Sequence, residues 1–92
     1  MKTVHARISG KVQGVWYRAW TVEQAKTHGI RGWVRNRTDG TVEALFQGDG
    51  QTVLALLEKC KDGPPMAKVT DISTEDVVEA SVYLDFTAES TL

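Results

Sequence analysis

The amino-acid sequence predicts an α+β sandwich, in which two helices cover one face of a mainly antiparallel sheet of four to five strands. Three observations predict it: segments with alternating apolar residues, two segments with helical apolar spacing, and glycine or proline breaks between them. The 92 residues suffice for one domain, which we expect to span residues 1–92. Only residues 89–92 are expected to be loosely held.

Extended segments are expected at residues 3–12, 31–37, 41–47, 68–73 and 81–86. The first of them alternates clearly, and the residues that share its apolar side are Val4, Ala6, Ile8, Gly10 and Val12. Thr38-Asp39-Gly40 lies between the second and third segments and predicts a hairpin turn. Residues 75–79 are expected to form an acidic, solvated connection before the last segment.

Helices are expected at residues 19–28 and 51–61. Val22 and Ala25 give the first an apolar stripe, and the stripe of the second consists of Val53, Leu56, Leu57 and Cys60. Asp49 is a candidate N-cap for the second helix, which Gly63-Pro64-Pro65 ends. The resulting order of strands and helices is the split βαβ, or ferredoxin-like, pattern. In that pattern the first and third strands are neighbours, and the end of the second approaches the loop after the first.

The loop between the first strand and the first helix is a candidate anion site. Backbone N–H groups from Gly14 to Arg18 have no strand partners, and the N-terminus of a helix attracts a phosphate. Gly14 lets the backbone bend, and the Arg18 guanidinium can bind two phosphate oxygens. Taken alone, these features also fit an ordinary strand-to-helix turn with a surface arginine.

A second candidate is Asn36, near the end of the second strand. Its side-chain amide can hold and orient a water without carrying charge. Asparagine is also common beside hairpin turns, so by itself Asn36 fits a purely structural role. The predicted fold brings both stretches to one small cleft, and this joint placement favours a site.

Two motifs carry a resemblance to a known family. The run from Ile8 to Arg18, with Gly10, Val12-Gln13-Gly14-Val15 and Tyr17-Arg18, closely resembles the first signature of the acylphosphatase family. Gly32-Trp33-Val34-Arg35-Asn36, continuing through Gly40 and Val42 to Gly48, resembles the second, and the segment from Gly63 to Val69 is similar to a further recurrent one. The sequence departs at Tyr17, where the family usually has phenylalanine, and carries a bulky Trp16 at a variable position.

The resemblance implies an enzyme that hydrolyses acyl phosphates without cofactor or metal. Arg18 falls on the family's phosphate-binding arginine and Asn36 on its water-positioning asparagine. The phosphate-binding residues would be Gln13, Gly14, Val15, Trp16, Tyr17 and Arg18. The expected partners are a small acyl phosphate and inorganic phosphate or a similar anion.

Composition limits the alternatives. The net charge of −1 offers no general attraction for nucleic acid, and no apolar run approaches the ~20 residues of a membrane helix. We expect no nucleic-acid or membrane partner and a cytoplasmic monomer. His5 and His28 are expected to be solvated surface residues rather than metal ligands, and Cys60 to be buried.

Two other functions stay open at this stage. The fold serves many roles, so a non-catalytic binding module is one alternative. A nucleic-acid binder is the other, because basic residues crowd the first part of the chain beside tryptophan and tyrosine: Arg7, Lys11, Arg18, Arg31, Arg35 and Arg37.

Overall fold

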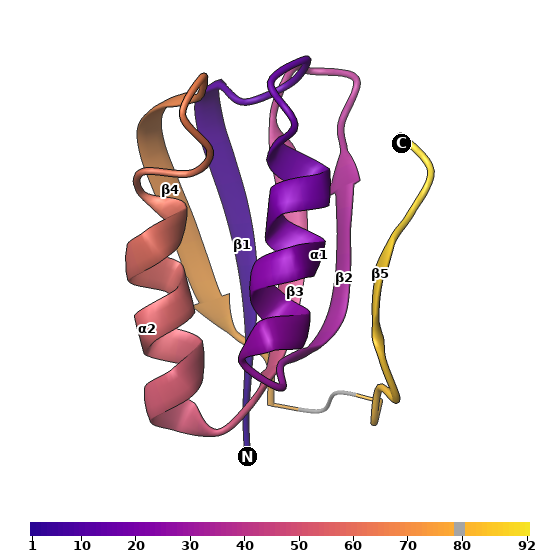
Figure 1. Cartoon of the computed structure of the whole chain (residues 1–92). Coiled ribbons are helices and arrows are strands. Elements are labelled where there is room, and N and C mark those ends of the chain that lie inside the picture. Colours follow the sequence, from indigo (N-terminus) through magenta and orange to yellow (C-terminus); the bar gives the residue numbers. More distant parts are fainter. Residues whose placement is uncertain (79–80) are drawn as a thin grey trace.

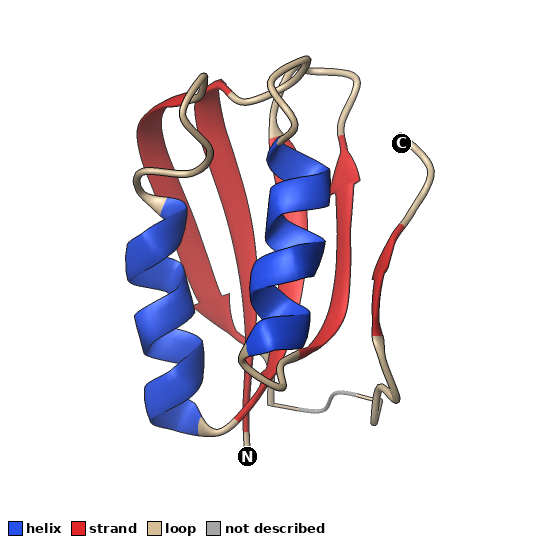
Figure 2. Ribbon diagram, in the orientation of Figure 1, coloured by secondary structure: helices blue, strands red, loops and turns tan. Residues whose placement is uncertain are grey.

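The computed structural model describes residues 1–78 and 81–92 and contains two helices and five strands. The strands are β1 (Lys2–Lys11), β2 (Arg31–Asn36), β3 (Val42–Gly48), β4 (Lys68–Asp76) and β5 (Phe86–Ala88), and the helices are α1 (Tyr17–Thr27) and α2 (Gly50–Cys60). Figure 1 shows their order along the chain, and Figure 2 shows both helices on the same face of the sheet. The predicted ferredoxin-like α+β sandwich is confirmed.

The five strands form one sheet in the order β4-β1-β3-β2-β5. Strand β1 pairs antiparallel with both β3 and β4, and β2 pairs antiparallel with β3. The first and third strands are therefore neighbours at the centre, as predicted. Strand β5 pairs parallel to β2, with Gly32 opposite Phe86, so the sheet is mixed. The sequence had left the pairing of this last strand open.

The core lies between the sheet and the helices. The predicted apolar side of β1 is buried, with Val4, Ala6 and Ile8 each at most 2% exposed. The stripe of α2 is buried at its predicted residues Val53, Leu56 and Cys60, while Leu57 packs partly against the core. Because apolar alternation and helical spacing each determine which side faces inward, the core followed from the sequence.

Two features of the loops were also predicted, a helix cap from Asp49 and a hairpin turn from Thr38-Asp39-Gly40. The Asp49 carboxylate caps α2, with the backbone N–H of Thr52 donating to Oδ2 at 3.1 Å. The turn at residues 37–40 closes a hairpin between β2 and β3, with the Gly40 N–H donating to the Arg37 carbonyl at 3.1 Å. Aspartate side chains accept hydrogen bonds from nearby backbone N–H groups at helix starts and turns. Both features could therefore be predicted from the sequence.

Helix α1 begins at Tyr17 instead of Ala19 and ends at Thr27 instead of His28. Trp16 is the N-cap with φ of +69°, so the chain enters the helix abruptly and Tyr17 already lies in its first turn. The residues buried along α1 are Tyr17, Thr21 and Ala25, one helical turn apart, so the apolar face includes an aromatic residue that the prediction had assigned to the loop.

Strand β4 continues to Asp76, three residues beyond the predicted end at Ser73. It does so because it follows β1 as far as the pair Val4–Asp76. Glu75 therefore belongs to a strand and not to an acidic connection, while Glu79 lies outside the described residues. In the sequence, exposed acidic side chains on an edge strand look like those of a solvated loop. Their pattern does not indicate that the backbone pairs with β1.

The C-terminal segment also differs from its prediction. The extended run expected at residues 81–86 is strand only from Phe86 to Ala88, because Gln47 engages the preceding segment: its Nε2 donates to the Ser81 carbonyl and its Oε1 accepts from the Tyr83 N–H. Residues 89–92 are hydrogen-bonded to the β2 side, not loose: the Glu89 N–H donates to the Val34 carbonyl at 2.8 Å.

Candidate active site

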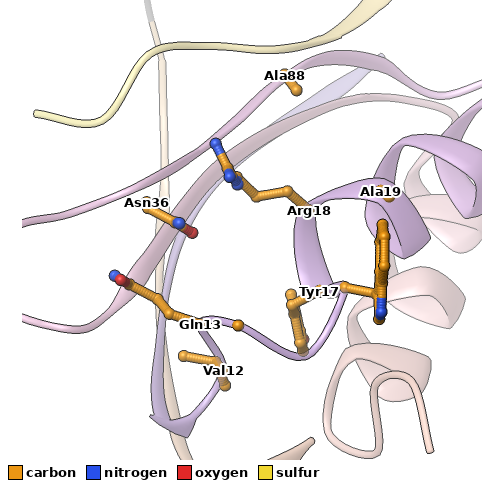
Figure 3. Close-up of a pocket in the computed structure, with 9 residues that line it drawn as sticks. Val12, Gln13, Tyr17, Arg18, Ala19, Asn36 and Ala88 are labelled. Carbon is orange, nitrogen blue, oxygen red and sulfur yellow. The ribbon is translucent and has the colours of Figure 1, made fainter. Parts of the chain in front are cut away.

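The loop after β1, the start of α1, the end of β2 and the last residue of β5 enclose a cleft of about 550 Å³. Its lining residues are Val12, Gln13, Gly14, Trp16, Tyr17, Arg18, Ala19, Asn36 and Ala88. In Figure 3 the side chains of Arg18 and Asn36 extend from different elements into this cleft. Both predicted catalytic residues and all but one of the predicted phosphate-binding residues therefore share one hollow.

The backbone N–H groups of residues 14–19 are the principal donors of the cleft. The first backbone bond of the α1 entry runs from the Trp20 N–H to the Trp16 carbonyl at 2.9 Å, and the N-cap makes no side-chain bond. Among the described residues, no N–H from 14 to 19 donates to a carbonyl or to a side chain of the protein. Unpaired amides at a helix start, together with the helix dipole, favour an anion.

The loop reaches this shape through two residues with positive φ. Gly14 has φ of +73° and Trp16 has φ of +69°. Residues that alternate in and out of this conformation turn successive N–H groups toward one concavity. Gly14 adopts it without strain, whereas Trp16 is the only described non-glycine residue that does so. A strained residue persists where its surroundings hold it in place.

Val15 is the exception among the predicted phosphate-binding residues. Its side chain is 4% exposed and belongs to the core, and Val15 does not line the cleft. Only its backbone is available to an anion. Tyr17 is also buried at 1% exposure, and its hydroxyl donates to the carbonyl of Cys60 at 2.6 Å. Both side chains anchor the loop to the core, which leaves the backbone as the part that meets a ligand.

Arg18 supplies the positive charge of the cleft. It is the second residue of α1, its side chain is partly buried, and none of the ion pairs among the described residues involves it. A guanidinium without an acidic partner beside free amides is suited to bind a phosphate through two oxygens.

The two side-chain amides of the cleft, those of Gln13 and Asn36, differ in their hydrogen bonds. The Gln13 amide Nε2 donates to the carbonyls of Arg37 and Thr41, at 2.7 and 2.9 Å. In Figure 3 its amide points away from Arg18, so this side chain holds the hairpin against the loop. The Asn36 side chain makes no hydrogen bond to the described residues and keeps its donors and acceptor for the cleft.

The face of the sheet opposite the helices carries most of the other basic residues. The Glu43 carboxylate, 13% exposed, lies 2.6 Å from His5 Nε2, 3.3 Å from Arg37 Nη1 and 3.6 Å from Arg35 Nε. Arg7 Nη2 lies 3.8 Å away. These contacts, with the ion pair between Arg7 and Asp39, offset two of the three arginine charges, so the basic crowding that had suggested nucleic acid is reduced but not removed. They also correct the prediction for His5, which is paired and partly buried rather than solvated.

The pKa of Glu43 reflects this crowded environment. Burial by itself raises the pKa of the carboxyl, but the hydrogen bond with His5 and the charges of Arg37 and Arg7 outweigh it. The net effect is a pKa below the ordinary value, so the carboxylate stays charged near neutral pH. Glu43 does not line the cleft, and it acts on the site only through the strands that it joins.

Other titratable groups give no catalytic cluster. Among the described residues, no three histidine, cysteine, aspartate or glutamate side chains lie close enough together to hold a metal ion. Cys60 is buried, and desolvation raises the pKa of its thiol to about 12. The polar groups that line the cleft are the Arg18 guanidinium, the side-chain amides of Gln13 and Asn36, and the loop backbone. No helix in the described part of the chain is long and apolar enough to span a membrane.

Sequence reasoning missed three cleft residues. Val12, Ala19 and Ala88 line the cleft although none carries a polar side chain. Ala88 lies far away in sequence and reaches the site only through the parallel pairing of β5 with β2, which no local pattern indicated. Trp20 does not line the cleft; its ring packs on Tyr17 with centroids 5.5 Å apart.

The arrangement is that of a small α+β protein in which a loop at a helix N-terminus presents unpaired backbone N–H groups and an arginine to a cleft that also contains the side-chain amide of Asn36. The acylphosphatase family model matches residues 4–88. The acylphosphatase of Rhodospirillum rubrum is 62% identical over 77 residues, which cover 84% of this chain and 85% of that protein. The acylphosphatase of Methylococcus capsulatus is 48% identical over 86 residues, or 94% of each chain.

Structural comparison gives the same result. The crystal structure of the acylphosphatase from Bacillus subtilis matches with a TM-score of 0.94 and 34% identity, covering 97% of this chain and 99% of that one. The chain therefore belongs to the acylphosphatase family, whose general activity is the hydrolysis of acyl phosphates.

Proposed function

We propose that the cleft hydrolyses acyl phosphates without a metal ion, with Arg18 and the loop amides holding the phosphoryl group and Asn36 orienting the attacking water. The observation that carries this proposal is the set of unpaired N–H groups at residues 14–19 beside the unpaired Arg18 guanidinium. An acyl phosphate has a carboxylate as its leaving group and needs little acid catalysis. Its hydrolysis depends mainly on positioning and charge stabilisation.

In this mechanism a water oxygen attacks phosphorus while the bond from phosphorus to the acyl oxygen breaks. The electron pair of that bond leaves with the carboxylate, and inorganic phosphate is the second product. The Arg18 guanidinium and the amides stabilise charge on the equatorial phosphoryl oxygens. The Asn36 amide accepts one hydrogen bond from the water and places it in line. No carboxylate or histidine lines the described cleft, so a phosphoryl oxygen of the substrate takes the water's proton.

The first test is hydrolysis of benzoyl phosphate by the purified chain in the presence of a chelator. We expect rapid loss of the anhydride absorbance, unchanged by the chelator. A rate equal to spontaneous hydrolysis would contradict the proposal. A pH–rate profile that follows an enzyme group, and not ionisation of the substrate, would contradict the role given to the phosphoryl oxygen.

Two variants separate the assigned roles. Arg18→Ala removes the charge that holds the phosphate, so it should lower kcat/KM by about 100-fold or more and weaken inhibition by inorganic phosphate. Asn36→Ala should lower kcat by about 100-fold while phosphate inhibition stays nearly unchanged, because the water site is separate from the cradle. Arg31→Ala, on β2 but outside the cleft, is the matched control for loss of an arginine. A fully active Asn36→Ala variant would refute the water assignment.

We further propose that residues 1–92 act as a single-domain, cytoplasmic monomer without nucleic-acid or membrane partners. The buried free thiol of Cys60 suits a reducing compartment. Glu43 and Asp39 pair with Arg7, Arg35 and Arg37 and so lower the positive charge that this face offers to a nucleic acid. Size-exclusion chromatography, cell fractionation and a salt-dependent titration with RNA test these points, and a dimer, a membrane-bound fraction or salt-sensitive RNA binding would each contradict one of them.

A further inference from the structure

Trp16 combines three features that a purely structural loop residue would not need. Its side chain is 79% exposed, although a tryptophan side chain gains most from burial. It lines the cleft beside Arg18. Its φ of +69° is a conformation that costs free energy for any residue with a Cβ atom. The loop therefore holds a large aromatic ring at the rim of the cleft at the expense of both solvation and backbone strain.

The surroundings of Trp16 are apolar and open. Ala19 from the first turn of α1 and Ala88 from β5 line the same cleft, and both are exposed. Arg18 and Asn36, the charged and hydrogen-bonding groups, are only partly exposed, whereas Trp16 and both alanines are exposed. The cleft thus has a polar part and an apolar rim.

An acyl phosphate likewise has a polar part and a part that can be apolar. Its phosphoryl group is a polar anion, and its acyl group is an organic substituent whose polarity varies from one substrate to another. If the phosphoryl group binds at the loop amides and Arg18, the acyl group extends toward the rim. There it meets the indole ring and the two alanines, which favour an apolar or aromatic surface.

From this geometry we infer that Trp16 is a specificity-determining residue, and that the enzyme prefers acyl phosphates with an aromatic or extended apolar acyl group. The inference rests on the proposed function, because it assigns the phosphoryl group to the polar part of the cleft. It adds a role for the side chain of a residue whose backbone alone would serve the phosphate.

The test compares kcat/KM for benzoyl phosphate and acetyl phosphate, each corrected for spontaneous hydrolysis. The variants are Trp16→Asn, which removes the ring and tolerates positive φ, and Trp16→Phe, which keeps an aromatic ring. We expect the benzoyl-to-acetyl ratio to fall about fivefold in the asparagine variant and to be largely retained in the phenylalanine variant. A ratio removes any effect common to both substrates, such as a small shift of the loop amides.

Two further measurements make the result independent of turnover and of general tryptophan loss. Benzylphosphonate should inhibit the unmodified enzyme better than methylphosphonate, and Trp16→Asn should reduce that difference by a similar factor. Trp33→Phe changes a tryptophan outside the cleft and should leave the ratio unchanged. An unchanged ratio in Trp16→Asn would overturn the inference while leaving the proposed function intact. Failure of the unmodified enzyme to hydrolyse either substrate would instead refute the proposed function.

Discussion

The hydroxyl of Tyr17, in the first turn of α1, donates a hydrogen bond of 2.6 Å to the carbonyl of Cys60, in the last turn of α2. In a continuing helix this carbonyl would accept from residue 64, which is a proline and has no N–H. The chain has also left the helix by then, since Gly63 has φ of +67° and its N–H donates to the Lys59 carbonyl. The tyrosine hydroxyl therefore satisfies a buried acceptor that the α2 backbone leaves open.

This bond ties the anion-binding loop to α2, so removing it should affect both stability and phosphate binding. Burial raises the pKa of Tyr17 far above its ordinary range, so the hydroxyl remains a donor at every working pH. Tyr17→Phe keeps the ring but leaves the carbonyl unpaired. We expect a loss of about 1–2 kcal/mol in the free energy of unfolding, measured by urea denaturation, and weaker competitive inhibition by phosphate, by about threefold.

A control separates loss of stability from movement of the loop. Val53→Ala removes a fully buried side chain from α2 and lowers stability without touching Tyr17 or the cleft. Its phosphate inhibition constant should stay unchanged. If Tyr17→Phe lowers stability but binds phosphate as well as the unmodified protein, the hydroxyl serves the fold alone.

Tyr17 illustrates which features of the structure could be predicted from the sequence and which could not. Local patterns predicted the buried side of β1, the stripe of α2 and the Asp49 cap, because each depends on residues a few positions apart. Arg18 and Asn36 could be placed in one cleft because the strand order implied it. The Tyr17–Cys60 bond joins residues 43 positions apart, and phenylalanine would satisfy the same hydrophobic pattern. Its partner therefore became visible only in three dimensions.

The predictions that were wrong also concern contacts between residues far apart in the sequence. The sequence pattern predicts that His5 is a polar residue on the outer side of a strand. Its pairing with Glu43 depends on the register between β1 and β3. Likewise β5 has only three residues, and Phe86 is fixed by stacking on Phe46, with ring centroids 5.7 Å apart. Short strands carry little periodicity, so neither their bounds nor their pairing can be predicted from pattern alone.

The Glu43 cluster predicts a stability that depends on pH. A carboxyl whose pKa is lowered by folding stabilises the protein above its unfolded pKa, and this contribution is lost as the pH falls through the folded value. Glu43→Gln should therefore reduce stability by about 1–2 kcal/mol near neutral pH, where four basic side chains would lose their common partner. Urea denaturation at a series of pH values measures the difference.

The difference between Glu43→Gln and the unmodified protein should shrink as the pH falls below the ordinary pKa of a glutamate and through the lowered pKa of Glu43, where the carboxyl takes up a proton. Glu58→Gln is a suitable control, because that glutamate is exposed and its one ion pair among the described residues is with Lys61, directly after α2. A stability difference that stays constant across the acid range would show that the variant acts through packing and not through charge.

Cys60 should be inert in the folded protein. It is 0% exposed, and burial raises the pKa of its thiol to about 12, so almost no reactive thiolate forms at neutral pH. We expect iodoacetamide to leave both the thiol and the activity intact in native buffer and to label the chain once urea unfolds it. Mass spectrometry measures the labelling. Rapid modification of the native enzyme with loss of activity would mean that the loop and α2 separate readily in solution.

The segment at residues 89–92 is predicted to support Asn36 through its backbone. The Leu92 N–H donates to the Asn36 carbonyl at 3.2 Å, and the Thr38 N–H donates to the Leu92 carbonyl at 3.0 Å. These bonds hold the end of β2 next to the cleft, where the water would lie. Removing residues 89–92 should let this strand end move and lower kcat for benzoyl phosphate by about threefold to tenfold, because water placement is sensitive to small displacements.

The inhibition constant of phosphate distinguishes an effect on the position of the water from an effect on phosphate binding. The loop amides and Arg18 lie on the other side of the cleft and keep their own anchors, so the deletion should change the phosphate inhibition constant by less than about twofold. Leu92→Ala is the matched control, since it removes a side chain that is 59% exposed but keeps both backbone bonds. If the deletion weakened phosphate binding and left kcat unchanged, the segment would act on the cradle and not on Asn36.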